Sequence, residues 1–126
     1  MFDIVPSAAD SSLLDATVGR PRPGAALLVA AGEVDTLTAP RLEAAVDDLL
    51  GTGCEVLVVD LSGITFLASS GLAVLIRAAH LAAADGRRLR LVARGRPVLR
   101  PLQITGTEEL FDLHTDRAAA LGLDRD

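Results

Sequence analysis

Apolar and polar positions along the chain divide it into strand-like and helix-like segments. Two apolar stretches, residues 13–18 and 25–31, flank a segment rich in proline, arginine and glycine at 20–24. Proline and glycine favour turns, and short apolar stretches on either side of a turn are typical of paired strands. The first part of the chain therefore predicts a β-hairpin.

A helical repeat follows the hairpin. After residue 36, apolar side chains recur at spacings of three and four, which places them on one face of an α-helix. Thr36 or Thr38 is the expected N-cap residue, and Gly51 or Gly53 is the expected end of the helix. The apolar face consists of Leu42, Ala45, Val46 and Leu49.

The next segment combines a strand with a helix. Residues 55–61 are mostly apolar and do not alternate with polar residues, which is typical of a central strand covered on both faces. Ser62-Gly63 is the expected hinge, and a helical pattern opens at residues 68–71 and ends at Asp85-Gly86. The predicted buried face of this helix consists of Leu72, Leu75, Ile76, Ala79 and Ala83.

The remaining residues predict two more strands, at 89–93 and 110–114, and two more helices. Pro97 or Pro101 begins the first of these helices, and Thr115 caps the second. A hairpin followed by α, β, α, β, α, β and α implies an α/β fold, with a mixed, mostly parallel sheet of roughly four to six strands and about four helices packed on it. Such folds place their sites at the carboxyl ends of strands.

Composition narrows the function classes. A chain of 126 residues is long enough for one domain, and its formal charge of −5 argues against general binding to nucleic acids or anionic membranes. The single cysteine, Cys54, excludes an intrachain disulfide, and no apolar run approaches the roughly 20 residues of a membrane span. The first residues lack the basic region of a signal peptide. These features predict a cytoplasmic protein.

Few residues carry a pattern typical of catalysis. Asp60 at a strand end is compatible with a phospho-accepting receiver domain, but that chemistry needs a lysine and the chain has none, so a structural role is favoured. His80 and His114 lack partners at metal-ligand spacing, and no Gly-x-Ser-x-Gly surrounds Ser69. We therefore expect no enzyme activity, cofactor or metal. Six arginines between residues 87 and 100 predict a solvated face, or alternatively a patch for an acidic partner.

Three segments carry a resemblance to a known family. Residues 60–72, DLSGITFLASSGL, resemble the signature of the STAS domain, specifically that of bacterial anti-sigma factor antagonists. The sequence GEVD at 32–35 followed by Thr38-Ala39 resembles the family's segment before its first helix, and residues 105–111 resemble its late segment. Three motifs in the right order are more specific than one. The resemblance covers residues 12–122, leaving 1–11 as a short strand or loose arm and 123–126 as a tail.

The resemblance implies a switch protein. Such a protein, unphosphorylated, binds an anti-sigma factor that is also a serine kinase, and thereby releases a sigma factor, as in stress responses; a serine phosphatase reverses the phosphorylation. By position, Ser69 is the implied phospho-acceptor, although Ala68 stands where the family often has aspartate. Ser70 is expected to cap the helix. The implied partner-binding residues are Glu33, Asp35, Thr38, Ala68, Ser69, Ser70 and Gly71.

Two other functions share the fold. One is an accessory STAS subunit of a membrane transport ATPase, and the other is a scaffold protein of a signalling assembly without a reversible phosphoserine. We expect a monomer or weak dimer that makes no direct contact with nucleic acid.

Overall fold

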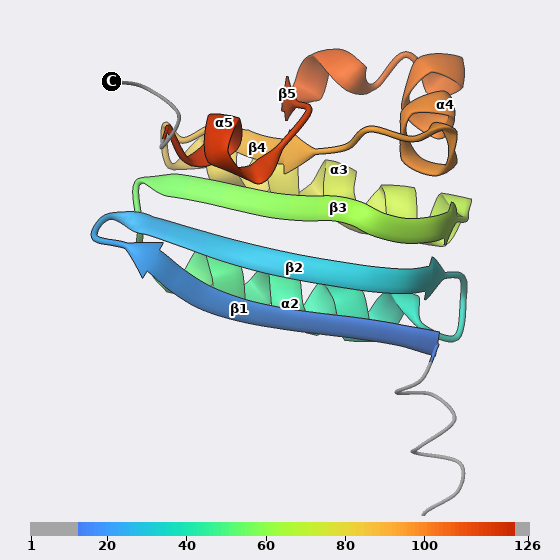
Figure 1. The fold of residues 1–126 in the computed structure, drawn as a ribbon, viewed down its shortest axis with the longest axis horizontal. Coiled ribbons are helices and arrows are strands. Elements are labelled where there is room, and N and C mark those ends of the chain that lie inside the picture. The colour runs from blue at the N-terminus through green and yellow to red at the C-terminus, as the bar shows by residue number, and fades with distance from the viewer. Residues whose placement is uncertain (1–12, 123–126) are drawn as a thin grey trace, which may run out of the picture.

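The computed structural model describes residues 13–122, so the predicted arm at 1–11 and tail at 123–126 lie outside the described residues. Five strands and four α-helices alternate along this part of the chain (Figure 1). In chain order they are β1 (Leu14–Arg22), β2 (Ala25–Val34), α2 (Ala39–Gly51), β3 (Val56–Leu67), α3 (Ser69–Ala84), β4 (Leu89–Val92), α4 (Arg96–Thr105), the 3-10 turn η1 (Glu108–Leu110), β5 (Asp112–His114) and α5 (Arg117–Leu121). The predicted element order and fold class are confirmed.

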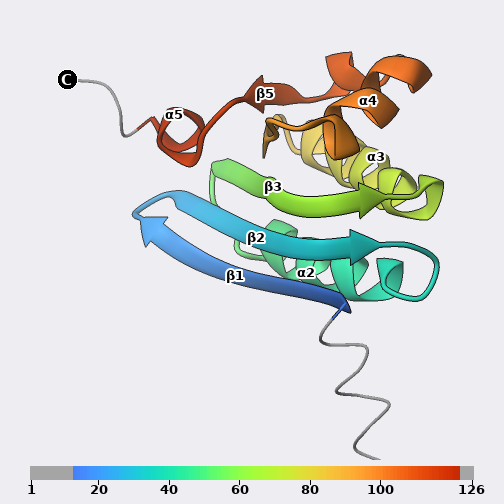
Figure 2. The ribbon, with the colours of Figure 1, turned by 45° about the vertical axis from the view of Figure 1, so that its right-hand side comes forward.

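The five strands form one mixed sheet in the order β1-β2-β3-β4-β5. β1 and β2 are the predicted antiparallel hairpin, and every later pair of neighbours is parallel. β3 lies in the centre, and its residues 57–61 are all buried, as the mostly apolar segment predicts. The carboxyl ends of β2 and β3 therefore lie side by side at one end of the sheet (Figure 2).

Helices cover the two faces of the sheet unequally. α2 and α3 lie on one face and α5 on the other (Figure 1). The larger core joins α2, α3 and α4 to one set of alternating strand residues, such as Leu28, Leu57 and Leu91. A smaller cluster on the other face joins Leu121 of α5 to Val58 and to other residues of the opposite alternation. Successive side chains of a strand point to opposite faces of the sheet, so neighbouring residues such as Leu57 and Val58 belong to different clusters.

The predicted hinge at Ser62-Gly63 is wrong, because β3 continues through it to Leu67. Pairing with β2 shifts at this point: Val29 pairs with Asp60, but Ala31 pairs with Gly63, so β3 carries one extra residue. Such an extra residue is a β-bulge, which bends a strand without ending it.

Two caps and one predicted buried position also differ from prediction. Thr38 occupies the N-cap position of α2, yet its hydroxyl makes no cap hydrogen bond. The N-cap of α5 is Asp116 rather than Thr115, because the Asp116 carboxylate accepts a hydrogen bond from the Ala119 amide at 2.7 Å. Within α3, Ala83 is exposed although Leu72, Leu75 and Ala79 are buried as predicted.

Gly71 allows the first turn of α3 to pack closely on the ends of β2 and β3. A Cβ atom at this position would lie 2.4 Å from Cγ1 of Val34 and 2.7 Å from Cδ1 of Leu67. We expect Gly71→Val to lower the free energy of unfolding by about 1 to 3 kcal/mol, since overpacking forces neighbours to move. Urea denaturation measures this loss. Ala73→Val, at an exposed position of the same helix, is the matched control with an expected cost of at most about 0.7 kcal/mol; equal losses for both variants would contradict the packing argument.

Candidate functional site

The carboxyl ends of β2 and β3 bring the two predicted halves of the site together. Glu33 pairs with Phe66 and Val34 pairs with Leu67 across the strands. Beyond them, the Ala68 amide donates a hydrogen bond to the Val34 carbonyl at 2.8 Å. The segment at 33–38 and the segment at 68–71 therefore lie next to each other at this end of the sheet.

The start of α3 is a helix amino terminus without a side-chain cap. Ala68 is the N-cap residue in an extended conformation, and its carbonyl accepts from the amides of Gly71 and Leu72, both at 3.0 Å. Ser69 and Ser70 occupy the first two helical positions, whose N–H groups have no intrahelical acceptor. An alanine offers no oxygen that could accept from them, so the positive end of the helix dipole stays uncompensated by a cap.

The two serines differ in exposure. Ser69 is exposed, whereas Ser70 is half-buried, and its hydroxyl oxygen has no hydrogen-bond partner within residues 13–122. The predicted cap at Ser70 is wrong, because a cap residue must lie before the first helical residue to reach the amides beyond it, and Ser70 already lies inside the helix. Of the two hydroxyls, that of Ser69 is accessible to another protein.

The loop between β2 and α2 is held by internal hydrogen bonds. The Asp35 carboxylate accepts from the amides of Leu37 at 2.9 Å and Thr38 at 3.1 Å. The Thr38 hydroxyl accepts from the Asp35 amide at 2.9 Å and donates to the Glu33 carbonyl at 2.8 Å. Thr38 is 2% exposed, so its side chain supports the loop from inside, while Glu33 is exposed.

A buried carboxylate lies at the bulge of β3. Asp60 is 3% exposed and accepts hydrogen bonds from the amide and hydroxyl of Ser62, at 2.9 and 2.7 Å, and from Arg117 of α5 at 2.9 Å. Burial by itself would raise the pKa of Asp60, but the hydrogen bonds from Ser62 and the Arg117 guanidinium outweigh it and hold the pKa below its ordinary value. Asp60 thus has the favoured structural role, and it ties α5 to the sheet.

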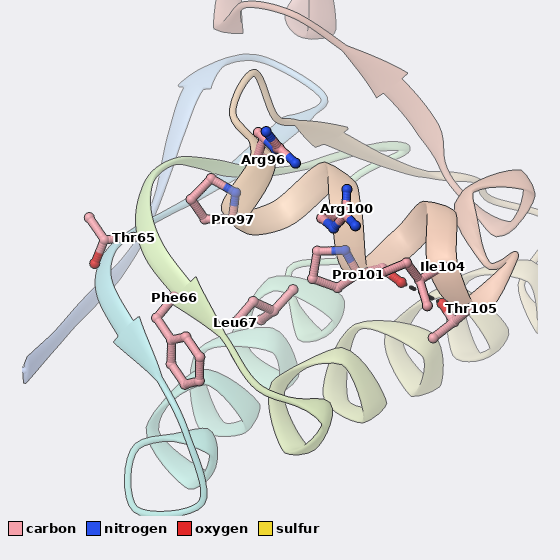
Figure 3. A pocket seen from close by; sticks show the side chains of 9 residues that line it. All are labelled: Thr65, Phe66, Leu67, Arg96, Pro97, Arg100, Pro101, Ile104 and Thr105. Carbon is pink, nitrogen blue, oxygen red and sulfur yellow. Dashed lines mark hydrogen bonds between the residues drawn. The ribbon is translucent and has the colours of Figure 1, made fainter.

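An apolar groove lies at the end of β3, a few residues before Ser69, and was not predicted from the sequence (Figure 3). It has a volume of about 370 Å³ between the end of β3 and α4. Phe66 is 51% exposed and Ile104 is 70% exposed. The remaining lining residues are Thr65, Leu67, Arg96, Pro97, Arg100, Pro101 and Thr105. Phe66 belongs to the family-like signature, but Ile104 lies 38 residues later, and no spacing pattern joins the two.

The six arginines do not form one solvated face. Arg87 donates to the Cys54 carbonyl at 2.8 Å, Arg88 to the Phe111 carbonyl at 3.1 Å, and Arg90 to the Ala120 carbonyl at 2.7 Å. These three connect separate segments of the chain. The other three, Arg94, Arg96 and Arg100, are exposed.

Between residues 13 and 122, no group of three or more histidine, cysteine, aspartate or glutamate side chains is arranged to hold a metal ion. In the same range, no helix has the length and apolar character needed to cross a membrane.

Solved structures with this architecture define the class of protein. An anti-sigma factor antagonist from Mycobacterium paratuberculosis superposes with a TM-score of 0.79 at 32% identity, over 90% of this chain and 95% of that one. The phosphorylated form of the Bacillus cell fate determinant SpoIIAA superposes with a TM-score of 0.67 over 88% of this chain and 100% of that one. At 15% identity, the likeness to SpoIIAA extends to the fold only.

Sequence comparison then identifies the family. The family described as "Mlab, STAS domain" matches residues 19–114. The anti-sigma-F factor antagonist RsfB of Mycobacterium tuberculosis is 34% identical over 98 residues, which are 78% of this chain and 80% of RsfB. The chain belongs to the STAS domain family, and the resemblance to anti-sigma factor antagonists inferred from residues 60–72 is confirmed by these relatives.

Proposed function

We propose that this protein is an anti-sigma factor antagonist switched by phosphorylation of Ser69. Unphosphorylated, it binds an anti-sigma factor that is also a serine kinase, and the bound anti-sigma factor releases its sigma factor. Phosphate on Ser69 ends the binding, and a serine phosphatase restores it. The chain has no catalytic step of its own in this scheme.

The observation that carries the proposal is the exposed Ser69 at the first position of the uncapped helix α3. The orphan amides and the helix dipole stabilise negative charge there, so a phosphate of about −1.5 to −2 charge is accommodated without unfolding. Glu33 and Asp35 flank Val34, whose carbonyl accepts from the amide of Ala68, the residue before Ser69, and this proximity supports a common binding surface. The relatives RsfB and the M. paratuberculosis protein, both anti-sigma factor antagonists, support the choice of partner.

The test begins with capture of partners from extract of the source cell. Wild type and Ser69→Ala, used as baits, are expected to retain an anti-sigma factor. Incubating each bait with that protein and ATP is then expected to add one phosphate to wild type and none to Ser69→Ala, as measured by intact mass. Ser70→Ala is the matched control, and it should still accept the phosphate. Modification of Ser69→Ala, or no modification of wild type, would refute Ser69 as the acceptor.

The same capture separates the two other functions. Retention of a transport ATPase in place of an anti-sigma factor would contradict the proposal and indicate the accessory-subunit role. Retention of an anti-sigma factor without phosphorylation would indicate a scaffold.

A further inference from the structure

Three arginines on α4 or just before it have no partner in the part of the chain that the structure describes. Arg94, Arg96 and Arg100 are exposed, and none makes a hydrogen bond or ion pair with residues 13–122. Arg96 and Arg100 line the groove itself (Figure 3). On a chain with a net charge of −5, this is a local positive cluster that attracts a carboxylate.

Apart from Arg96 and Arg100, most residues that line the groove are apolar. Phe66 and Ile104 expose 51% and 70% of their surface, and Pro97 and Pro101 complete the wall. Apolar side chains gain about 25 cal/mol for each Å² removed from water, so the groove favours an occupant with apolar side chains next to an acidic one. The groove therefore favours a segment that carries a carboxylate between apolar side chains.

The first residues of this chain have that combination. Residues 2–5 read Phe-Asp-Ile-Val, with one carboxylate between bulky apolar side chains. Residues 6–12 are proline, serine, alanine and aspartate, a small and polar composition suited to a connecting segment.

The point of attachment lies at the correct end of the sheet. Leu14, the first residue of β1, pairs with Gly32, and Gly32 pairs with Ile64 of β3. Two strand spacings amount to about 10 Å, and Thr65, the next residue of β3, already lines the groove. Residues 6–12 extended reach about 24 Å, which is enough to place residues 2–5 in the groove.

The carboxyl-terminal residues 123–126 are too short to reach the groove. Leu121 of α5 accepts a hydrogen bond from Arg22 at 2.9 Å, next to the turn between β1 and β2. That turn lies at the amino end of β3, since Ala25 pairs with Val56. The 12 residues of β3 extend about 40 Å, whereas residues 123–126 reach about 14 Å.

We propose that residues 2–5 dock in the groove, with their apolar side chains on Phe66 and Ile104 and the Asp3 carboxylate facing Arg96 and Arg100. Phe66 lies three residues before Ser69. A docked segment therefore lies close to the start of α3, which carries Ser69. The docking itself is independent of whether Ser69 is phosphorylated.

Backbone amide chemical shifts of the full 126-residue chain test the docking. The double substitution Phe2→Ser with Ile4→Ser is expected to move the amide signals of residues 65–67 and 96–105 and to leave those of α2 unchanged. Ser7→Ala with Ser11→Ala, in the connecting segment, is the matched control and should leave the groove signals in place. Unchanged groove signals in the Phe2/Ile4 variant would overturn the proposal.

Charge exchange tests the orientation. Asp3→Arg should displace the segment and reproduce the shifts of the Phe2/Ile4 variant, and adding Arg96→Asp and Arg100→Asp should restore a docked state. The wild-type groove signals should not change on dilution. Changes on dilution would show that the occupant is the arm of a second copy, and a lack of rescue by the arginine exchange would also refute the pairing.

Discussion

Ser69→Glu is expected to weaken binding to the anti-sigma factor captured by the wild-type chain by at least about 30-fold, which corresponds to about 2 kcal/mol. Ser69 is exposed at the first position of α3, two residues after the end of β3. A carboxylate at this position is buried without a partner when another protein docks, and leaving one charge unpaired in an interface costs about 2 to 5 kcal/mol. Isothermal titration calorimetry measures the change.

The loss should come from the interface and not from the fold. A negative charge in the first turn of a helix stabilises it by about 0.3 to 1 kcal/mol, so the thermal midpoint of Ser69→Glu should equal or exceed that of wild type. The glutamine of Ser69→Gln has nearly the same shape as glutamate but no charge, so this variant should lose less affinity than Ser69→Glu. Ala84→Glu adds the same charge at the opposite end of this 16-residue helix, and its affinity should match wild type. Equal losses of affinity for Ser69→Gln and Ser69→Glu would show that the size of the side chain, and not its charge, weakens the binding.

Local patterns were sufficient to predict the element order. The spacing of Leu42, Val46 and Leu49 predicts α2, and the mostly apolar segment at 55–61 predicts a central strand. Both predictions work because the order of apolar residues in the sequence reflects which faces of an element are buried. The proximity of residues 33–38 to residues 68–71 comes from the observed pairing of β2 with β3 and was not among these predictions.

Features that depend on individual hydrogen bonds were not predictable in this way. Thr38 and Ser70 are residue types that favour N-caps, yet the Thr38 hydroxyl binds the loop before its helix, and Ser70 lies two residues past the N-cap position of α3. The bulge in β3 depends on the Asp60 carboxylate, which binds Ser62 and an arginine 57 residues away. The groove depends on the packing of α4 against the end of β3, and no local spacing encodes that contact.

Asp60→Asn is expected to lower the free energy of unfolding by about 2 to 4 kcal/mol at neutral pH. The side chain keeps its size, and one oxygen can still accept from the amide and hydroxyl of Ser62. The other oxygen accepts a hydrogen bond from Nε of Arg117 at 2.9 Å and forms an ion pair with Nη2, also at 2.9 Å. In the variant this oxygen is replaced by an amide group that donates. The donor groups of asparagine and Arg117 then face each other at a position that is 3% exposed, and the hydrogen bond between Asp60 of β3 and Arg117 of α5 is lost.

The effect should depend on pH in one direction. The pKa of Asp60 is lower in the folded protein than the value of about 3.9 expected in the unfolded chain, so the unfolded state takes up this proton first as the pH falls. The stabilisation is complete above about pH 5 and is lost as the pH falls through the folded pKa. Urea denaturation of wild type and Asp60→Asn should therefore give a constant difference from about pH 7 to pH 5 and a smaller one near pH 3.

Two controls separate this network from a general loss of negative charge. Asp48→Asn removes a carboxylate from an exposed position of α2 and should change stability by at most about 0.5 kcal/mol at either pH. Arg117→Gln removes the guanidinium and leaves the bonds from Ser62, so it should cost less than Asp60→Asn, and the double variant should cost less than the sum of the two single ones. Additive losses would mean that Asp60 and Arg117 stabilise the fold independently, and that the 2.9 Å contact between them carries no coupling.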